Sequence, residues 1–304
     1  MKKALKKSLR NDLKCYLLLL LPIVWFGVFF IFSFFRGLYF SFTDFDIVRS
    51  TTRGITFIGF DNYAAIFKDE LFWRGMKNST IWTFVMLAGN NFFGLLMAVL
   101  IANVKRGKSF FLAALYWPTL VSAAVGTQVT LLLFKPASDG FFNIIAAHFG
   151  AKEPIMWLES EKTSLLSLMM LPFLLGFCMK MMIYYAGIRG IPASYSESAS
   201  LETNSKFKMF FKITFPLIAP VVFLNVLLSL MEGFRVLAPM QLIAPGNRYS
   251  LSVVYYLYEK TFGTNFGRSG QISYSSAIGF ILFVIIMGVT VFYNKVKKGG
   301  TTFE

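Results

Sequence analysis

The chain has 304 residues, of which 56% are hydrophobic, 18% aromatic and only 15% charged, and its mean hydropathy is +0.61. A soluble globular domain cannot hide so much apolar surface, whereas apolar runs of about 20 residues are typical of helices that cross a bilayer. The net charge of +15 lies in short segments between apolar runs and forms no separate basic domain. This placement argues against a nucleic-acid partner and favours an integral membrane protein.

Six apolar segments are each long enough to cross hydrocarbon. The first follows the basic stub MKKALKKSLRNDLK. It is too long for a signal peptide, and no cleavage site of small residues follows it. The sequon Asn78–Thr80 lies where the second segment enters the membrane, and we expect its Ser or Thr to cap that helix. The six segments are about Cys15–Phe34, Thr80–Val104, Phe110–Phe134, Ser164–Ile188, Leu217–Leu237 and Ile272–Tyr293.

The distribution of charge predicts the orientation of these spans. Six spans place both termini on one face, and the segments predicted on that face carry 16 Lys and Arg against four Asp and Glu. Basic residues concentrate on the cytoplasmic side of membrane proteins. We therefore expect a multi-pass protein of the plasma (inner) membrane with a cytoplasmic stub (1–14), one transmembrane domain (15–294) and a cytoplasmic tail (295–304). The longest cytoplasmic loop spans 189–215.

No group of residues in the sequence indicates a catalytic or metal site. The two cysteines, Cys15 and Cys178, lie at or within apolar segments, and His148 is the single histidine. The tripeptide GKS at Gly107–Ser109 lacks the second glycine of a phosphate-binding loop, because Ala102 occupies that position. The chain also has no Walker motif of its own, so we expect it to be no enzyme and to bind no cofactor.

The segment Tyr195–Pro220 of the longest cytoplasmic loop, YSESASLETNSKFKMFFKITFPLIAP, is patterned rather than irregular. Its first residues are small or polar and permit close approach of a partner. Phe207, Phe210 and Phe211 then follow at helical spacing on one face, and Pro216 suits the first turn of the next span. The pattern fits either a docking element for a partner protein or a helix that lies on lipid headgroups.

This loop resembles the EAA loop of permease subunits in binding-protein-dependent ABC importers. The family pattern is E-A-A, three residues, G, nine residues and I-x-L-P. Here Glu197-Ser198-Ala199, Thr203 and Ile213-Thr214-Phe215-Pro216 stand at the same spacing. The departures are Ser198 for Ala, Phe215 for Leu and Thr203 for Gly. Of these, Thr203 matters most, because glycine adopts unusual backbone angles at little cost.

Three further stretches resemble the carbohydrate branch of that family, which includes maltose-type and multiple-sugar permeases. They are GFDNYAAIF in the first external loop, PIMWL at Pro154–Leu158, and YYAGIRGIPASY at Tyr184–Tyr195, which leads into the patterned segment. The resemblance covers nearly the whole chain. It implies an all-α permease with about six spans and a cytoplasmic coupling-helix loop.

The resemblance implies a mechanism and a set of partners. The loop would insert as a coupling helix into a groove of a separate ATPase, and the phenylalanines would pack the second helix onto the subunit's own core. The partners would be a second permease subunit, two ATPase subunits or domains that bind ATP-Mg, an extracytoplasmic sugar-binding protein and membrane lipid. The implied coupling residues are Glu197, Ser198, Ala199, Glu202, Thr203, Ile213 and Pro216.

Polar residues inside the apolar segments are candidates for the substrate pathway. Inserting a charged group into the hydrocarbon of the membrane costs about 2.5–3.5 kcal/mol, so such residues usually serve a function or pair with a partner. A hydrated sugar pathway would use Asn91, Asn225, Glu232 and Arg235. The alternative is structural: Glu232 pairs with Arg235 three residues on, and Lys180 extends its amine toward the membrane surface.

The sequence is compatible with three other functions. An ABC importer permease could carry a phosphate, amino acid or peptide instead of a sugar. An ion-coupled secondary transporter would need inverted repeats or a chain of buried carboxylates, and the sequence offers only Glu232 at depth. A membrane enzyme would need clustered His, Asp or Cys near one membrane face, which the sequence lacks.

Overall fold

The computed structural model describes residues 16, 18–47, 54–192, 194–195, 205–263 and 265–300. Within these ranges the regular elements are helices, and the β pairing is limited to one isolated bridge between Thr43 and Phe57. The all-α prediction is confirmed. The elements are η1 (Gly27–Phe32), α2 (Ser33–Ser41), α4 (Asp61–Phe67), α5 (Glu70–Asn103), α6 (Lys108–Tyr116), η2 (Trp117–Leu120), α7 (Ala123–Leu133), α8 (Phe141–His148), α9 (Ser164–Arg189), α11 (Lys206–Met209), η3 (Phe210–Thr214), α12 (Phe215–Gly233), α13 (Ala238–Ile243), α14 (Val253–Thr261) and α15 (Ile272–Gly300).

The described part of the chain contains five helical stretches long and apolar enough to span a membrane. A sixth is formed by Lys108–Leu120 and Ala124–Leu133, two helices that meet at a bend of 92°. The structure thus has five candidate spans, or six when the bent pair is counted as one span, which agrees with the prediction of about six. The other five candidates are Leu18–Ser41, Glu70–Asn103, Ser164–Arg189, Lys206–Ile243 and Ile272–Lys295.

Helix α5 begins ten residues before the predicted start of the second span. Asp69 caps it, since its Oδ1 accepts a hydrogen bond from Leu71 N at 2.9 Å. The prediction that Ser79 or Thr80 forms the cap is therefore wrong. A helix of 34 residues is about 51 Å long and exceeds the hydrocarbon thickness of about 30 Å. Its polar first turns therefore extend beyond the membrane and pack against other parts of the protein.

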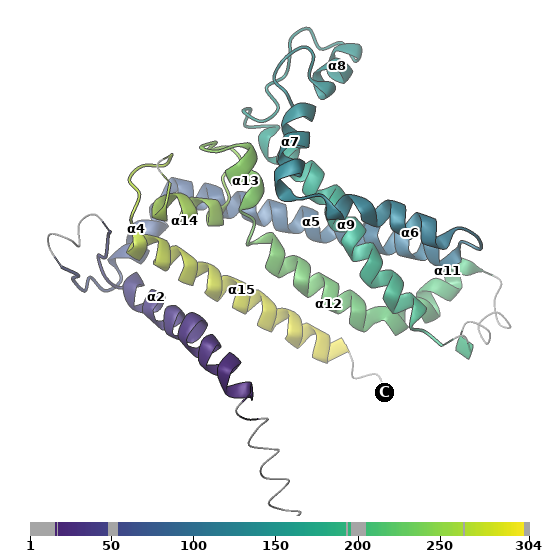
Figure 1. Cartoon of the computed structure of the whole chain (residues 1–304), viewed down its shortest axis with the longest axis horizontal. Helices are drawn as coiled ribbons and strands as arrows, with labels where there is room; N and C mark the ends of the chain where they lie inside the picture. The colour runs from purple at the N-terminus through teal and green to yellow at the C-terminus, as the bar shows by residue number, and fades with distance from the viewer. Residues whose placement is uncertain are drawn as a thin grey trace, which may run out of the picture.

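Helices α9 and α12 pack against α5, and α15 joins this group through α14 and α12. Figure 1 shows α5, α9, α12 and α15 as the long elements, with α7 and α8 projecting away from them. Close helix contacts occur where a glycine removes the side chain. A Cβ on Gly94 would lie 2.9 Å from Lys180 Cβ, and one on Gly233 would lie 2.6 Å from Thr83 Oγ1. Small residues of this kind let membrane helices approach backbone to backbone.

The first span contacts the bundle mainly through its second half. Helix α2 packs along α15, with Phe34 against Phe280 and Phe283 at ring-centroid distances of 5.1 and 5.3 Å. None of the most apolar 18-residue window in Leu18–Ser41 is buried. A surface this apolar requires lipid or another protein chain around it.

Candidate functional site

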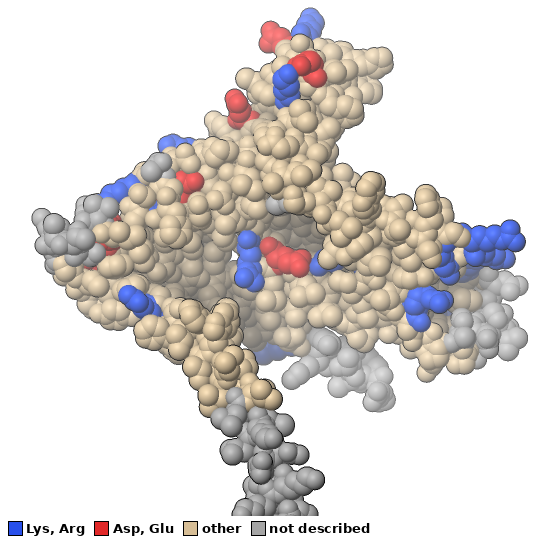
Figure 2. All heavy atoms as spheres, in the orientation of Figure 1, with Lys and Arg blue, Asp and Glu red and all other residues tan. Residues whose placement is uncertain are grey.

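A central cleft of about 490 Å³ opens between α5, α9 and the end of α12. It lies roughly halfway along α5, at Trp82, Met86 and Asn90, and its remaining wall is formed by Pro172 and Gly176 of α9 and by residues between Ser229 and Pro239. Figure 2 shows a hollow in the middle of this face in which acidic and basic side chains lie close together. The cleft is bounded on one side by the break between α12 and α13. Broken helices of this kind occur in membrane proteins where the backbone lines a cavity.

Two of the charged residues at this depth form an ion pair across helices. Lys180 Nζ lies 3.2 Å from Glu232 Oε2. The lysine side chain is 7% exposed, whereas that of Glu232 is 67% exposed and lines the cleft. The alternative prediction, an ion pair between Glu232 and Arg235 with Lys180 extended to the surface, is wrong. Arg235 bonds to Glu232 only through the backbone, with its N 3.1 Å from the Glu232 carbonyl oxygen.

Asn91 binds neighbouring helices together and is absent from the cleft wall. Its Oδ1 accepts a hydrogen bond from Tyr184 OH at 2.6 Å, and its Nδ2 donates to Ser229 Oγ at 3.0 Å. Asn225 is fully buried one turn before Ser229, whose Oγ donates to the Asn225 carbonyl oxygen at 2.8 Å. Of the four predicted pathway residues, the cleft therefore contains Glu232 and Arg235, while the two asparagines lie between packed helices.

Asn90 is a cleft residue that the sequence did not single out. It is 7% exposed and lines the central cleft. Its Nδ2 lies 3.8 Å from Met86 Sδ, and its Oδ1 has no hydrogen-bond partner among the described residues. A buried acceptor without a partner costs about 1–3 kcal/mol, which a ligand that donates a hydrogen bond would offset. The adjacent asparagines differ by about 100° around the helix, and the sequence does not say which one faces the cleft.

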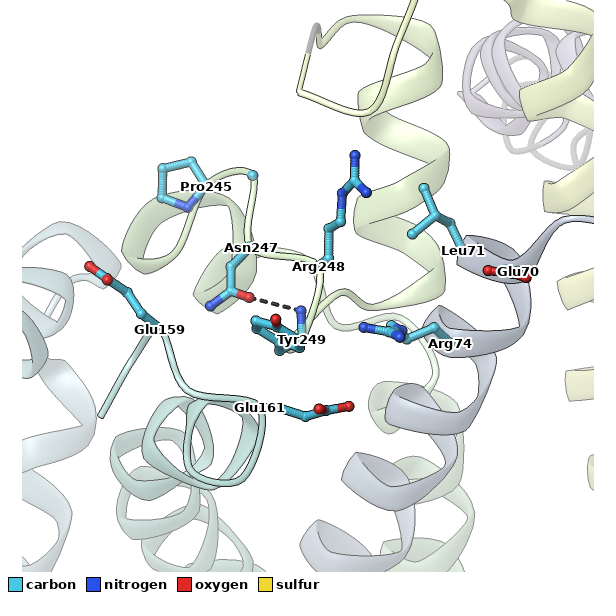
Figure 3. A pocket seen from close by; sticks show the side chains of 10 residues that line it. Glu70, Leu71, Arg74, Glu159, Glu161, Pro245, Asn247, Arg248 and Tyr249 are labelled. Carbon is cyan, nitrogen blue, oxygen red and sulfur yellow. Dashed lines mark hydrogen bonds between the residues drawn. The ribbon is translucent and has the colours of Figure 1, made fainter. Parts of the chain in front are cut away.

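An outer cleft of about 710 Å³ lies at the N-terminal end of α5. Figure 3 shows it between the first turns of α5, the loop before α9 and the loop after α13, with Arg74 and Glu161 directed into the same space. The Arg74 guanidinium lies 5.8 Å from the centre of the Tyr249 ring. This site has no signal in the sequence because its walls come from three segments that lie far apart in the chain.

Hydrogen bonds from two asparagines hold the loop after α13 in place beside the outer cleft. Asn247 Nδ2 donates to Ser164 Oγ at 3.0 Å and also to the Leu158 carbonyl oxygen. Asn78 Nδ2 donates to the Tyr249 and Leu251 carbonyl oxygens at 2.8 and 2.9 Å. Asn78 is therefore a structural anchor inside α5.

Asp69 joins α5, α14 and α15 near the outer cleft. Its Oδ2 accepts hydrogen bonds from Tyr256 OH and, at 2.6 Å, from Tyr274 OH. Partial burial raises the pKa of Asp69, but the hydrogen bonds from these two tyrosines and from the helix backbone outweigh burial and hold the pKa below its ordinary value. Lys260 Nζ lies over both tyrosine rings, 5.2 and 5.7 Å from their centres. The carboxylate is therefore ionised at neutral pH and fixes the three helices relative to one another.

An inner cleft of about 410 Å³ adjoins the predicted coupling loop. It is bounded by the ends of α5 and α9 and by α11 and η3, and it contains Arg189, Lys206 and Phe210. Ile213 lies in η3 and Pro216 in the first turn of α12, as its sequence pattern predicts. The other predicted coupling residues lie outside the described residues: Glu197, Ser198, Ala199, Glu202 and Thr203.

Two of the three phenylalanines of the loop, Phe207 and Phe211, do not pack into the core, so the prediction is wrong for them, whereas Phe210 is half-buried and lines the inner cleft. Phe207 is 72% and Phe211 51% exposed, and their ring centroids lie 4.6 Å apart. The helix runs without interruption from α11 through η3 into α12. The π-helical turn η3 ends at Thr214, two residues before Pro216, which has no N–H for the carbonyl four residues earlier. The exposed rings therefore form a surface that lipid or a partner protein can cover.

Comparison with known proteins gives relatives that match along most of the chain. No family model matches the sequence. The probable ABC transporter permease protein YesP of Bacillus subtilis is 27% identical over 273 residues, which cover 88% of this chain and 85% of that protein. The multiple sugar-binding transport system permease protein MsmF of Streptococcus mutans is 25% identical, covering 92% and 93%. The sn-glycerol-3-phosphate transport system permease protein UgpA of Rhizobium meliloti is 26% identical, covering 95% and 96%.

Solved structures share the fold over nearly the full length. A chain of a bacterial ABC transporter involved in the import of the acidic polysaccharide alginate superposes with a TM-score of 0.80 at 21% identity, covering 98% of this chain and 99% of that one. A second structure, of the alginate transporter in complex with an alginate pentasaccharide-bound periplasmic protein, gives a TM-score of 0.81 at 19% identity, covering 97% and 98%.

The fold and the relatives are those of multi-pass membrane permeases of ABC transporters. The curated relatives that match most of the chain are ABC transporter permeases, the family that the sequence resembles.

Proposed function

We propose that this chain is the permease subunit of an ATP-driven importer for a di- or oligosaccharide and forms half of its translocation pathway. Relatives named for arabinooligosaccharide transport and for multiple-sugar transport support a carbohydrate. The observation that carries the proposal is the central cleft. It places an unpartnered amide oxygen, a hydroxyl and two charged groups at membrane depth, where such groups are costly unless they serve a ligand or a water-filled path.

The proposed function requires partners that cover the exposed faces of the chain. A second permease subunit would complete the pathway along the open side of the central cleft. An extracytoplasmic binding protein would deliver the sugar at the outer cleft, where Glu70, Glu159, Glu161, Arg74 and Arg248 offer charges of both signs. Charged groups at the rim of an interface guide partners into register.

Two cytoplasmic ATPase subunits would drive the cycle. The coupling loop and the inner cleft beside it would receive the movement of these subunits, and the continuous helix from α11 to α12 would carry it to the break that borders the central cleft. A rigid helix held in a socket transmits a two-state movement. In this proposal both termini are cytoplasmic, this chain is not catalytic, and ATP-Mg is bound by the ATPase subunits.

Reconstitution tests the proposed function directly. The complete transporter, in liposomes with ATP on the ATPase side, should accumulate a labelled oligosaccharide, and the double variant Glu197→Ala with Ala199→Arg should hydrolyse ATP without uptake or fail to retain the ATPase. The double variant Lys105→Ala with Lys108→Ala, in another loop predicted on the same face, should transport normally. Normal uptake by the first double variant, or uptake without an ATPase partner, would contradict the proposal.

One alternative substrate has a specific observation in its favour. UgpA proteins of several bacteria, named for sn-glycerol-3-phosphate transport, match 95% of this chain in Rhizobium meliloti and 89% in Escherichia coli O157:H7. A non-sugar solute of that kind would compete with the labelled oligosaccharide for uptake. If glycerol 3-phosphate is accumulated and saccharides are not, the importer remains and the carbohydrate assignment is replaced.

A further inference from the structure

The charges of the central cleft do not balance. Lys180 and Glu232 neutralise each other through their contact of 3.2 Å. Arg235 lines the same cleft with an exposed side chain, and no acidic group within 4.0 Å pairs with it in the described part of the chain. The cleft therefore carries one excess positive charge inside the candidate span Lys206–Ile243.

An excess positive charge in this place attracts an anion strongly. The walls of the cleft are largely apolar and at membrane depth, so the field of Arg235 is screened less than at the protein surface. A guanidinium also presents several N–H donors in one plane, which match the paired oxygens of a carboxylate or a phosphate. A neutral saccharide would gain little from a guanidinium in this position compared with an amide.

The rest of the cleft fits a sugar ring. Asn90 and Ser229 both line the cleft. The Ser229 Oγ is already engaged by Asn91 and by the Asn225 carbonyl, so the acceptor left for a hydroxyl group is the Asn90 Oδ1, which is buried in the wall and has no hydrogen-bond partner among the described residues. Trp82 contributes an aromatic wall and is itself 4% exposed. The volume of about 490 Å³ lies within the range of about 300–1,000 Å³ that is usual for small-ligand sites.

Lys180 explains how a cleft that contains Glu232 can still accept an anion. Glu232 would repel an anionic substrate if its carboxylate were free. The buried ammonium of Lys180 binds that carboxylate from behind the cleft wall and cancels its charge. Arg235, on the open side, is then the charge that the substrate meets.

We propose that the central cleft takes a saccharide that carries an anionic group, a carboxylate or a phosphate ester, with Arg235 binding the anion and Asn90 accepting a hydrogen bond from a ring hydroxyl. This inference rests on the proposed function and narrows its substrate class. Arg235 is a specificity-determining residue, and Lys180 is a positioning residue that acts through Glu232.

The test uses the complete transporter with its binding protein and ATPase subunits in liposomes. Matched pairs of saccharides serve as probes: galacturonate oligomers against galactose oligomers of equal length, and galactose 1-phosphate against galactose. ATP-dependent uptake of an anionic member is expected to exceed that of its neutral partner, and the pair that responds tells a carboxylate from a phosphate. Arg235→Gln should lower kcat/KM for that anionic probe by about 10- to 100-fold, the loss expected for a hydrogen bond between charged groups.

Matched variants separate recognition of charge from damage to the fold. Arg235→Lys should recover part of the uptake, because it restores the charge without the planar fork. Arg106→Gln removes the same charge from an exposed loop outside the clefts and should leave uptake unchanged. Uptake of the neutral member at least equal to the anionic one, or an unchanged kcat/KM in Arg235→Gln, would overturn the inference while leaving the importer intact. Absence of ATP-dependent uptake for every saccharide, with an ATPase that still assembles and hydrolyses, would overturn the proposed function and this inference with it.

Discussion

We expect the two partners of the Lys180–Glu232 ion pair to differ in how much their substitution lowers the stability of the protein. Glu232→Gln removes the counter-charge and leaves a lysine side chain, 7% exposed, without its partner. Breaking a fully buried pair in this way costs about 3–5 kcal/mol. Because the Glu232 side chain is two-thirds exposed and the contact is a single one of 3.2 Å, we expect a smaller loss of about 2–3 kcal/mol.

Lys180→Met should cost much less. It replaces the buried ammonium by an apolar group of similar length, and Glu232 stays solvated on the open side of the cleft. Exchanging a buried charge for a well-packed apolar side chain is often neutral, so we expect a change within about 1 kcal/mol. The double variant should resemble Lys180→Met, since Glu232→Gln does no further harm once the ammonium is gone.

The assay is the thermal stability of the purified complex in detergent, followed as the fraction that stays monodisperse after heating. The control is the exposed pair Lys135–Asp139, whose side chains are 48% and 66% exposed. Breaking that pair should change stability by less than about 1 kcal/mol. If Lys180→Met proves as destabilising as Glu232→Gln, or if the two effects add in the double variant, the reasoning about the buried ammonium is wrong.

Three further predictions concern helix packing. Asn91→Leu leaves a tyrosine and a serine hydroxyl on neighbouring helices without this partner, and should lower thermal stability by about 1–2 kcal/mol, whereas Asn91→Gln should recover part of the loss. Gly233→Ala places a Cβ 2.7 Å from Thr83 Cα and should cost about 1–3 kcal/mol through overpacking, with Gly27→Ala, where nothing lies within 4 Å, as a near-neutral control. The lowered pKa of Asp69 means that its contribution to stability is complete above its ordinary value of 3.8 and is lost as pH falls through the still lower folded pKa. The melting temperature of the wild type should therefore fall steeply as the pH drops below 3.8. Asp69→Asn is already destabilised at neutral pH and should lose less. Equal acid sensitivity of the two proteins would contradict this role of Asp69.

The positions of the spans were predictable because hydropathy reports directly on burial in lipid. Five of the six predicted segments correspond to single helical stretches, and Pro216 opens α12 as its pattern indicated. Hydropathy does not predict where a helix continues outside the membrane. The polar first turns of α5 are held by packing and by the Asn78 hydrogen bonds to the loop after α13, contacts between residues more than 170 positions apart that a local pattern does not contain.

The site was predictable in composition and only partly in geometry. Glu232 and Arg235 were identified because charges are rare at membrane depth, and both line the cleft. The partner of Glu232 is Lys180, 52 positions away, and helical spacing alone favoured the nearer Arg235. The choice between Asn90 and Asn91 depends on the rotation of α5 about its axis, which is set by the packing of α9 and α12 against it.

Blocking the central cleft tests most directly whether sugar passes through this subunit. Asn90→Trp would fill the space between α5 and the break after α12, and Phe92→Trp, at a side chain 63% exposed on another face of the same helix, is its matched control. The proposed pathway predicts that the Asn90→Trp complex assembles with its ATPase and binding protein but loses ATP-dependent saccharide uptake, while Phe92→Trp transports normally. Uptake at the wild-type rate through an assembled Asn90→Trp complex would contradict it.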